Sequence, residues 1–239
     1  MWSFLHRQTL AESGVLEGIT DYHSHILPGV DDGIQAIEDS LNLLILYEQL
    51  GIKELWLTPH IMEDYPNDTN ILKYKFYDLY TEYKKYSKSH IKMFLASEYM
   101  LDSLFISRLN NRDVLPINNN QILIETSYYS PPINFKNVLK LINSNGYIPI
   151  LAHPERYHYI SKIKVYEELY KEGIKFQLDI ASLVGAYGED IRCKAITLVQ
   201  KGYYSFVGTD THKLETFKQW INTPINHSVL RDFKKIINK

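Results

Sequence analysis

Short apolar runs alternate with segments of helical periodicity along almost the whole of this chain. Parallel strands that are buried on both faces are apolar throughout, and successive parallel strands need a helical crossover between them. The alternation therefore predicts about seven β/α units. The runs that we expect to be strands are one ending at residues 21–25 and those at 55–60, 91–98, 121–125, 148–153, 176–180 and 203–210.

The segments between these runs carry apolar residues three and four positions apart, as on one face of a helix. In the first segment Ile37, Leu41 and Leu44 share a face. Gly51 follows, where a glycine can end the helix in the left-handed conformation. The other helices are expected at about residues 71–88, 101–109, 135–142, 163–170, 191–199 and 224–237.

This order of elements is typical of an α/β domain, either a barrel or a doubly wound sheet, and both carry the active site at the carboxyl ends of the strands. A length of 239 residues suits one barrel, since α/β barrels of ~200–250 residues are routinely single domains. Residues 1–18 are predicted to be an N-terminal extension, an arm or a surface strap, on a domain of residues 19–239.

Charge and composition narrow the class of partner. The formal net charge of −2 gives no reason to expect a nucleic acid, and no basic run suggests a membrane surface. No apolar run approaches the ~20 residues of a membrane span, and the N-terminus lacks the apolar core of a signal peptide. The single cysteine, Cys193, excludes an intramolecular disulfide framework and suits a reducing compartment. We therefore expect a cytoplasmic protein with a small or peptide-like partner.

Nearly every expected strand ends in a residue that can bind a metal ion. His23 and His25 point to the same face of an extended strand, although such a pair alone is as often structural as it is a metal clamp. In a parallel sheet the ends of the strands meet at one rim, so we expect a joint site there. The candidates are His23, His25, His60, Glu98, Glu125, His153, Asp179, Asp210 and His212.

Imidazole and carboxylate ligands without thiolate suit Mn, Fe, Zn or Mg. More than six candidates make a site of two or three ions more natural than a site of one. Glu98, in the middle of the rim, is the expected bridge between ions. Ions held in this way generate hydroxide near neutral pH, which indicates hydrolytic chemistry.

The order of these residues resembles the polymerase and histidinol phosphatase (PHP) superfamily. Within it, residues 21–25, 30–33, 152–157 and 209–212 are similar to motifs of the bacterial tyrosine-protein phosphatases encoded with capsular and exopolysaccharide systems. The resemblance runs from about Thr20 to about Leu214. It implies a distorted (β/α)7 TIM-like barrel that holds two or three divalent ions, Mn first among them. It also implies hydrolysis of phosphotyrosine by attack of metal-bound hydroxide on a protein substrate, such as the tail of a bacterial tyrosine kinase of polysaccharide synthesis or export.

The resemblance also implies which residues hold each ion. His23, His25, Glu98 and Asp210 would hold the first ion, and Glu98, Glu125 and His153 the second. Asp32, His60 and His212 would hold the third. Asp31 offers the same chemistry as Asp32, and their spacing does not separate them. Asp179 has no place in the motif order and is expected to support the site without binding a metal.

Arg156, Asp210 and His212 are the residues expected to act in catalysis. Arg156 follows His153 by three residues, and its guanidinium can contact two phosphate oxygens at once. The relatives carry a second arginine after the Asp-x-His motif. In this chain Phe217 stands at about that place and Lys213 and Lys218 flank it, and a lysine supplies charge without the two-pronged contact.

Two other functions remain open at this point, and a third is disfavoured. A PHP-type phosphomonoesterase could act on a small substrate such as histidinol phosphate or a sugar phosphate. A metal-stabilised module could bind a kinase tail without hydrolysing it. An amidohydrolase also begins with His-x-His, but it usually bridges its metals with a modified lysine, where this chain has Glu98. If the substrate is a peptide, the loop of residues 128–132 after Glu125 is the one best placed to line its groove.

Overall fold

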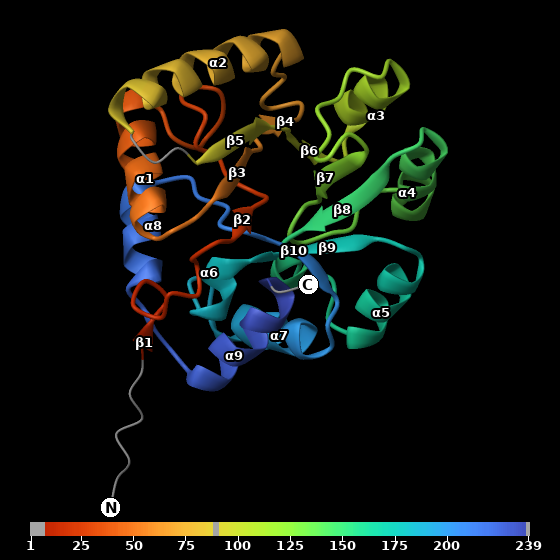
Figure 1. The fold of residues 1–239 in the computed structure, drawn as a ribbon. Coiled ribbons are helices and arrows are strands. Elements are labelled where there is room, and N and C mark those ends of the chain that lie inside the picture. Colours follow the sequence, from red (N-terminus) through yellow and green to blue (C-terminus); the bar gives the residue numbers. More distant parts are fainter. Residues whose placement is uncertain (1–7, 88–90, 238–239) are drawn as a thin grey trace, which may run out of the picture.

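Seven parallel strand units form the centre of the computed structural model, which describes residues 8–87 and 91–237 (Figure 1). Two of the units are each interrupted by two residues, at residues 58–59 and at residues 96–97, and each of these units therefore counts as two strands. In chain order the strands are β2 (Thr20–Asp21), β3 (Glu54–Leu57), β4 (His60–Ile61), β5 (Lys92–Leu95), β6 (Glu98–Met100), β7 (Gln121–Glu125), β8 (Ile148–Ala152), β9 (Lys175–Asp179) and β10 (Tyr204–Gly208).

The strands close into a barrel. One sheet has the order β10-β9-β8-β7-β6-β4 and the other the order β2-β3-β5, and their strand pairs are parallel. The ring closes between β2 and β10, where Tyr22 N donates to Val207 O at 3.0 Å and Asp210 N donates to His23 O at 2.8 Å. The distorted (β/α)7 TIM-like barrel is therefore confirmed, and its distortion lies at the two interrupted strands.

Helices cover the outside of the barrel (Figure 1). In α4, for example, Val138, Leu139 and Ile142 are buried, which stabilises the domain by about 1.5–3 kcal/mol for each side chain. The Asp68 and Asp102 side chains accept backbone N–H groups at the starts of α2 and α3. The main helices are α1 (Ile37–Gln49), α2 (Thr69–Tyr86), α3 (Ser103–Asn110), α4 (Phe135–Ser144), α5 (Ile163–Lys171), α7 (Glu189–Gln200), α8 (Leu214–Ile221) and α9 (His227–Ile237).

The C-terminal region differs from the sequence prediction. The last helix begins at His227, because Pro224 and Ile225 form β11 and pair antiparallel with β1 (Gln8–Thr9). The single turns α6 (Ile180–Leu183) and η1 (Pro154–Arg156) were not predicted, since they are too short to show a clear period. The helix α8 was missed although Leu214, Phe217 and Trp220 are buried at helical spacing. Residues 8–18 of the expected extension contribute Leu10, Val15 and Leu16 to the core, and residues 1–7 lie outside the described part.

Side chains that point into the barrel separate its floor from its mouth. Trp56, Ala96, Leu123 and Ile150 belong to a small apolar cluster. Successive inward positions lie two residues apart along a strand, so Glu125 follows Leu123 on the same face of β7. The inner face therefore changes from apolar to ionisable at the carboxyl ends of the strands. Within the described residues, none of the helices has the length and apolar content that crossing a bilayer requires.

Candidate metal centre

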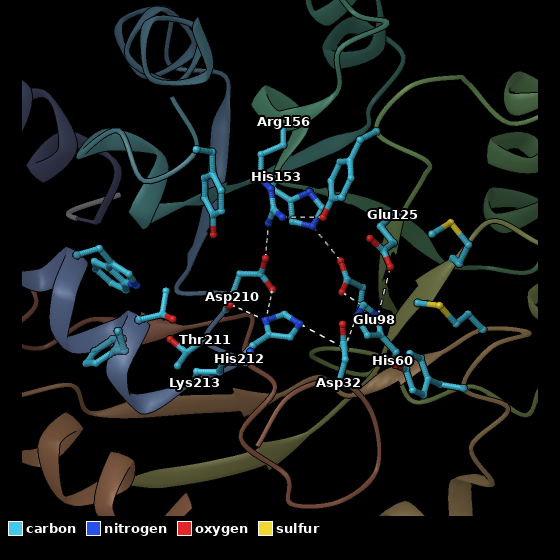
Figure 2. Close-up of a pocket in the computed structure, with 18 residues that line it drawn as sticks. Asp32, His60, Glu98, Glu125, His153, Arg156, Asp210, Thr211, His212 and Lys213 are labelled. Atoms are coloured by element: carbon cyan, nitrogen blue, oxygen red, sulfur yellow. Dashed lines mark hydrogen bonds and ion pairs between the residues drawn. The ribbon is translucent and has the colours of Figure 1, made fainter. Parts of the chain in front are cut away.

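A cavity of about 550 Å³ opens at the carboxyl ends of the strands. Figure 2 shows Arg156 and His153 on one side of it, with Glu98, Glu125 and His60 facing them. Two of the predicted ligands, His23 and His25, are fully buried near this mouth. The other seven line the cavity: Asp32, His60, Glu98, Glu125, His153, Asp210 and His212.

The deepest group contains His23, His25, Glu98 and Asp210. The Nε2 atoms of His23 and His25 are 3.0 Å apart. Glu98 Oε2 lies 3.1 and 3.3 Å from these two nitrogens, and Asp210 Oδ1 lies 3.2 and 3.3 Å from them. Ligand atoms at about 2.0 Å from a tetrahedral metal ion are about 3.3 Å apart, so these spacings match the shell of one ion.

A second group contains His60, Glu98 and Glu125. His60 Nδ1 lies 3.3 Å from Glu98 Oε2 and 3.2 Å from Glu125 Oε1. His153 contacts the same centre through Nε2, which lies 3.2 Å from Glu98 Oε1. The family resemblance implies Glu98, Glu125 and His153 for the second ion. In the structure His60 completes the group with Glu98 and Glu125, and His153 lies outside this group but contacts Glu98. Glu98 therefore faces the imidazoles of His23, His25, His60 and His153, as a bridge should.

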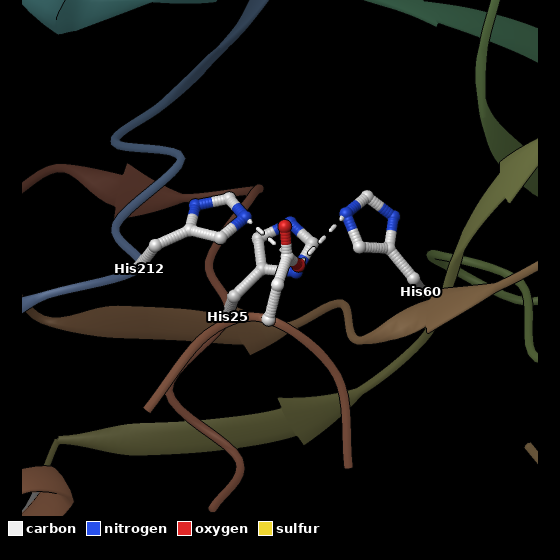
Figure 3. A group of neighbouring side chains, drawn as sticks. His25, His60 and His212 are labelled. Carbon is white, nitrogen blue, oxygen red and sulfur yellow. Dashed lines mark ion pairs between the residues drawn. The ribbon is translucent and has the colours of Figure 1, made fainter. Parts of the chain in front are cut away.

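The third group contains His25, Asp32, His60 and His212. Asp32 Oδ1 lies 3.5 Å from Nε2 of His60 and 3.5 Å from Nε2 of His212. The rings of His25, His60 and His212 lie next to one another (Figure 3), with centroids 4.0 Å apart for His25 and His212. His60 thus presents Nδ1 to the second group and Nε2 to the third.

The backbone is unusual where β8 and β10 deliver their ligands. His153 has a φ of +32° and Asp210 a φ of +48°, in the left-handed region that costs a non-glycine residue about 1–3 kcal/mol. Gly208 ends β10 directly behind His23, and a Cβ atom at Gly208 would lie 2.5 Å from Cβ of His23. Close packing at this point holds the His23 ring near the Asp210 carboxylate.

The charges of the centre fit divalent cations. Burial acts to lower the pKa of His23, but the carboxylates of Glu98 and Asp210 raise it to about 9. Without ions, protonated imidazoles therefore balance the buried carboxylates, and cations can take the place of those protons. Several buried atoms also have no hydrogen-bond partner among the described residues. These atoms are His60 Nδ1, Glu98 Oε2, His153 Nδ1 and Asp210 Oδ1.

Arg156 forms the cationic wall of the cavity. Its Nη1 pairs with Asp210 Oδ2 and lies 3.3 Å from Asp179 Oδ2, and its Nη2 donates to the Tyr128 hydroxyl at 2.7 Å. The guanidinium carbon lies 4.8 Å from the centroid of the Tyr128 ring and 4.3 Å from that of Tyr187. Two rings and two carboxylates therefore hold the guanidinium in one orientation at the edge of the metal centre.

Comparison with known proteins agrees with this geometry. The family model described as "Capsular polysaccharide synthesis, CpsB/CapC" matches residues 19–227. The chain belongs to the CpsB/CapC family. Two relatives are each 28% identical to it and cover 82% of this chain and 78% of their own length. They are the putative tyrosine-protein phosphatase CapC of Staphylococcus aureus, over 199 residues, and the tyrosine-protein phosphatase YwqE of Bacillus subtilis, over 201 residues.

Other relatives of this CpsB/CapC-family chain match more of its length. The tyrosine-protein phosphatase CpsB of Streptococcus agalactiae is 22% identical over 222 residues, which are 90% of this chain and 91% of that protein. A chain from the crystal structures of YwqE from Bacillus subtilis and CpsB from Streptococcus pneumoniae, described as unique metal-dependent tyrosine phosphatases, has the same fold. Its TM-score is 0.79 at 24% identity, with 92% of this chain and 88% of that chain covered.

Two buried side chains orient the histidines of this CpsB/CapC-family site. Asp31 Oδ2 accepts His25 Nδ1 at 2.8 Å and the backbone N–H of His60 at 3.0 Å, so Asp31 supports the ligands, whereas Asp32 faces His60 and His212. Gln177 Oε1 accepts His23 Nδ1 at 2.9 Å, which leaves Nε2 of His23 toward the cluster. Gln177 was not predicted from the sequence, although it is a polar residue inside the apolar run of β9.

The remaining charged candidates take different places. Lys213 lines the cavity of this CpsB/CapC-family chain, and Phe217 lines it with a fully buried side chain. Lys218 is exposed on α8 and is not part of the lining. Asp179 is buried, accepts the N–H of Ala181 at the start of α6 and pairs with Arg156. It belongs to none of the three ligand groups, and the supporting role expected for it stays a prediction.

Proposed function

We propose that this chain is a metal-dependent protein-tyrosine phosphatase, which hydrolyses the phosphate ester of phosphotyrosine on a protein. One observation carries the proposal: three groups of candidate ligands adjoin at an open cavity that Arg156 also lines. Each pair of groups has one residue in common, which is His25, His60 or Glu98. Relatives described as tyrosine-protein phosphatases support this choice within the family.

Nine proposed metal ligands would hold two or three divalent ions, with Mn as the first candidate. They are His23, His25, Asp32, His60, Glu98, Glu125, His153, Asp210 and His212. Ions bound there supply Lewis-acid stabilisation of phosphoryl charge and a source of hydroxide near neutral pH. Asp210 joins the two parts of the site, since Oδ1 faces His23 and His25 while Oδ2 pairs with Arg156. A shift of Asp210 would therefore disturb both the ligand shell and the guanidinium.

The residues of the chain would position the phosphoryl group. Arg156 can offer its guanidinium N–H groups to two phosphoryl oxygens, and Tyr128 and Tyr187 keep that group aligned. A phenolate leaving group has a conjugate acid pKa of ~10, so it departs with less help than an alkoxide needs. Cys193 is exposed on α7 and does not line the cavity, which fits a mechanism without a covalent cysteine intermediate.

The cavity has room for an aryl phosphate. At about 550 Å³ it falls within the ~300–1,000 Å³ range of organic ligand sites and extends past the metal centre along Met62, Tyr65 and Trp220. We also propose that the substrate is a tyrosine kinase of polysaccharide synthesis; the family description supports the link to polysaccharide synthesis. The single cysteine supports action in the cytoplasm.

A substrate panel tests the proposal. The enzyme loaded with Mn²⁺ is compared on a phosphotyrosine peptide, a phosphoserine peptide, histidinol phosphate and a sugar phosphate. We expect the highest kcat/KM on the phosphotyrosine peptide. A preference for one of the small phosphates would show a PHP-type phosphomonoesterase, and binding of the phosphopeptide without turnover would show a recognition module.

A further inference from the structure

A second, smaller cleft lies beside the catalytic cavity on the same rim of the barrel. It has a volume of about 210 Å³, and apolar side chains form most of its walls: Pro131, Phe135, Tyr159, Val165 and Leu169. Phe135 belongs to α4 and Val165 to α5, the neighbouring helices that follow β7 and β8 (Figure 1). Dry apolar cavities of ~150 Å³ accommodate benzene, so this cleft can hold a leucine or phenylalanine side chain.

The loop of residues 126–134 connects the cleft to the catalytic cavity. Tyr128 lines the cavity and its carbonyl accepts His158 N at 2.7 Å, whereas Pro131 lines the cleft. Thr126 Oγ1 and the Tyr159 hydroxyl, 2.8 Å apart, fasten the start of the loop to the cleft wall. Beyond these anchors the loop exposes Tyr129 by 78% and Ile133 by 90%. These two side chains leave apolar surface open to a peptide that crosses the loop.

A row of aromatic rings sets the distance between the two sites. The ring of His153, at the metal centre, lies 5.8 Å from that of Tyr157, which lies 5.5 Å from that of Tyr159 in the cleft wall. The Tyr159 ring is therefore within about 11 Å of the His153 ring. An extended peptide advances about 3.3 Å per residue, so three or four residues span this distance.

The rim charges decide which side chain the cleft can take. Lys136 of α4 pairs with Glu172 at 3.1 Å, and Glu168 pairs with Lys164 at 4.0 Å. Because these charges are balanced within the rim, the cleft favours a neutral apolar side chain over a charged one.

From this geometry we propose that the cleft binds an apolar side chain of the substrate, three or four residues from the phosphotyrosine, while loop 126–134 carries the peptide between the two sites. This inference rests on the proposed phosphatase function and adds the substrate feature that the enzyme selects. Burial of one such side chain corresponds to a gain of about tenfold or more in kcat/KM.

Phosphotyrosine peptides with alanine flanks test the proposal. One series carries a single leucine three or four residues before or after the phosphotyrosine, and the reference peptide carries none. We expect one leucine position to raise kcat/KM about tenfold, and to tighten the Kd of the matching non-hydrolysable phosphonate peptide by the same factor.

The variant for this test is Val165→Asp, because Val165 is 38% exposed and an acidic residue is favourable in the first turn of α5. It should remove the advantage of the leucine peptide and leave turnover of the alanine peptide and of p-nitrophenyl phosphate unchanged. Ile71→Asp, at a 55% exposed position on α2, is the matched control and should change neither.

Each other outcome has its own meaning. Equal kcat/KM for all peptides, or equal losses on every substrate in Val165→Asp, would overturn the cleft proposal and leave the phosphatase function intact. Failure of the unmodified enzyme to hydrolyse any phosphotyrosine peptide would overturn the proposed function, and the cleft proposal with it. A dimer in sedimentation that Val165→Asp dissociates, without any effect of leucine, would assign the cleft to a second copy of the chain.

Discussion

His25 Nδ1 and Asp31 Oδ2 are 2.8 Å apart, and both side chains are buried. A carboxylate can only accept this hydrogen bond, so Nδ1 carries the proton and Nε2 of His25 faces the metal centre. Burial acts to raise the pKa of Asp31, but His25 and the backbone N–H of His60 lower it to about 2. Asp31 therefore remains charged at every pH at which the enzyme could work.

Asp31→Ala should weaken metal binding by about 10–100-fold, because His25 would lose its fixed tautomer and orientation. A competition titration with a chromogenic chelator measures this loss. Asp31→Asn retains an acceptor and should recover part of the affinity. If Asp31→Ala binds metal as tightly as the unmodified protein, the orienting role of Asp31 is wrong.

Arg156→Lys should lower kcat/KM for p-nitrophenyl phosphate by about 10²–10³-fold, since lysine keeps the charge but not the two-pronged contact with phosphoryl oxygens. Steady-state kinetics measure the loss, and metal analysis should show unchanged occupancy. An equal loss of metal in this variant would mean that Arg156 acts mainly through Asp210, with which it pairs.

Asp210→Asn and His153→Ala should each abolish turnover of p-nitrophenyl phosphate, because each removes a proposed ligand. Cys193→Ser should retain full activity, since Cys193 is exposed on α7. The three variants are assayed in parallel with Mn²⁺ present. Inactivity of the cysteine variant alone would replace the metal mechanism with a covalent one.

Gly208→Ala should displace His23, because the added Cβ would lie 2.5 Å from Cβ of His23 and 2.6 Å from Nε2 of Gln177. Forced overpacking of this kind costs about 1–3 kcal/mol. We expect a lower Tm together with reduced metal content. Ser205→Ala, at an exposed position of the same strand, is the control and should change neither quantity.

Removal of the ions should lower Tm. An ion present at 100 times its Kd adds about 2.7 kcal/mol, which for a domain of this size corresponds to a Tm change of about 5–10 °C. The pKa of His23 is raised to about 9 without ions, so metal binding must release protons and the affinity should increase as the pH rises toward 9. Calorimetry in buffers of different ionisation enthalpy measures that release. Binding without proton release would contradict this account of the site.

The fold could be predicted because periodicity and strand ends carry most of its information. Residues 121–125 form β7 as predicted, and the helix expected before Gly51 ends at Gln49. The two-residue strand β11 could not be predicted, since its pairing with β1 determines it. The choice between Asp31 and Asp32 depends on which carboxylate meets His25 Nδ1, and sequence spacing contains no such information.

The shared position of Glu98 has a consequence for how the centre fills. Its Oε2 lies 3.1–3.3 Å from three imidazoles and its Oε1 lies 3.2 Å from a fourth. The first ion to arrive would fix this carboxylate in the orientation that the next ion needs. Loading should then be cooperative, with a Hill coefficient above one, and partly filled molecules should be scarce at every concentration of metal.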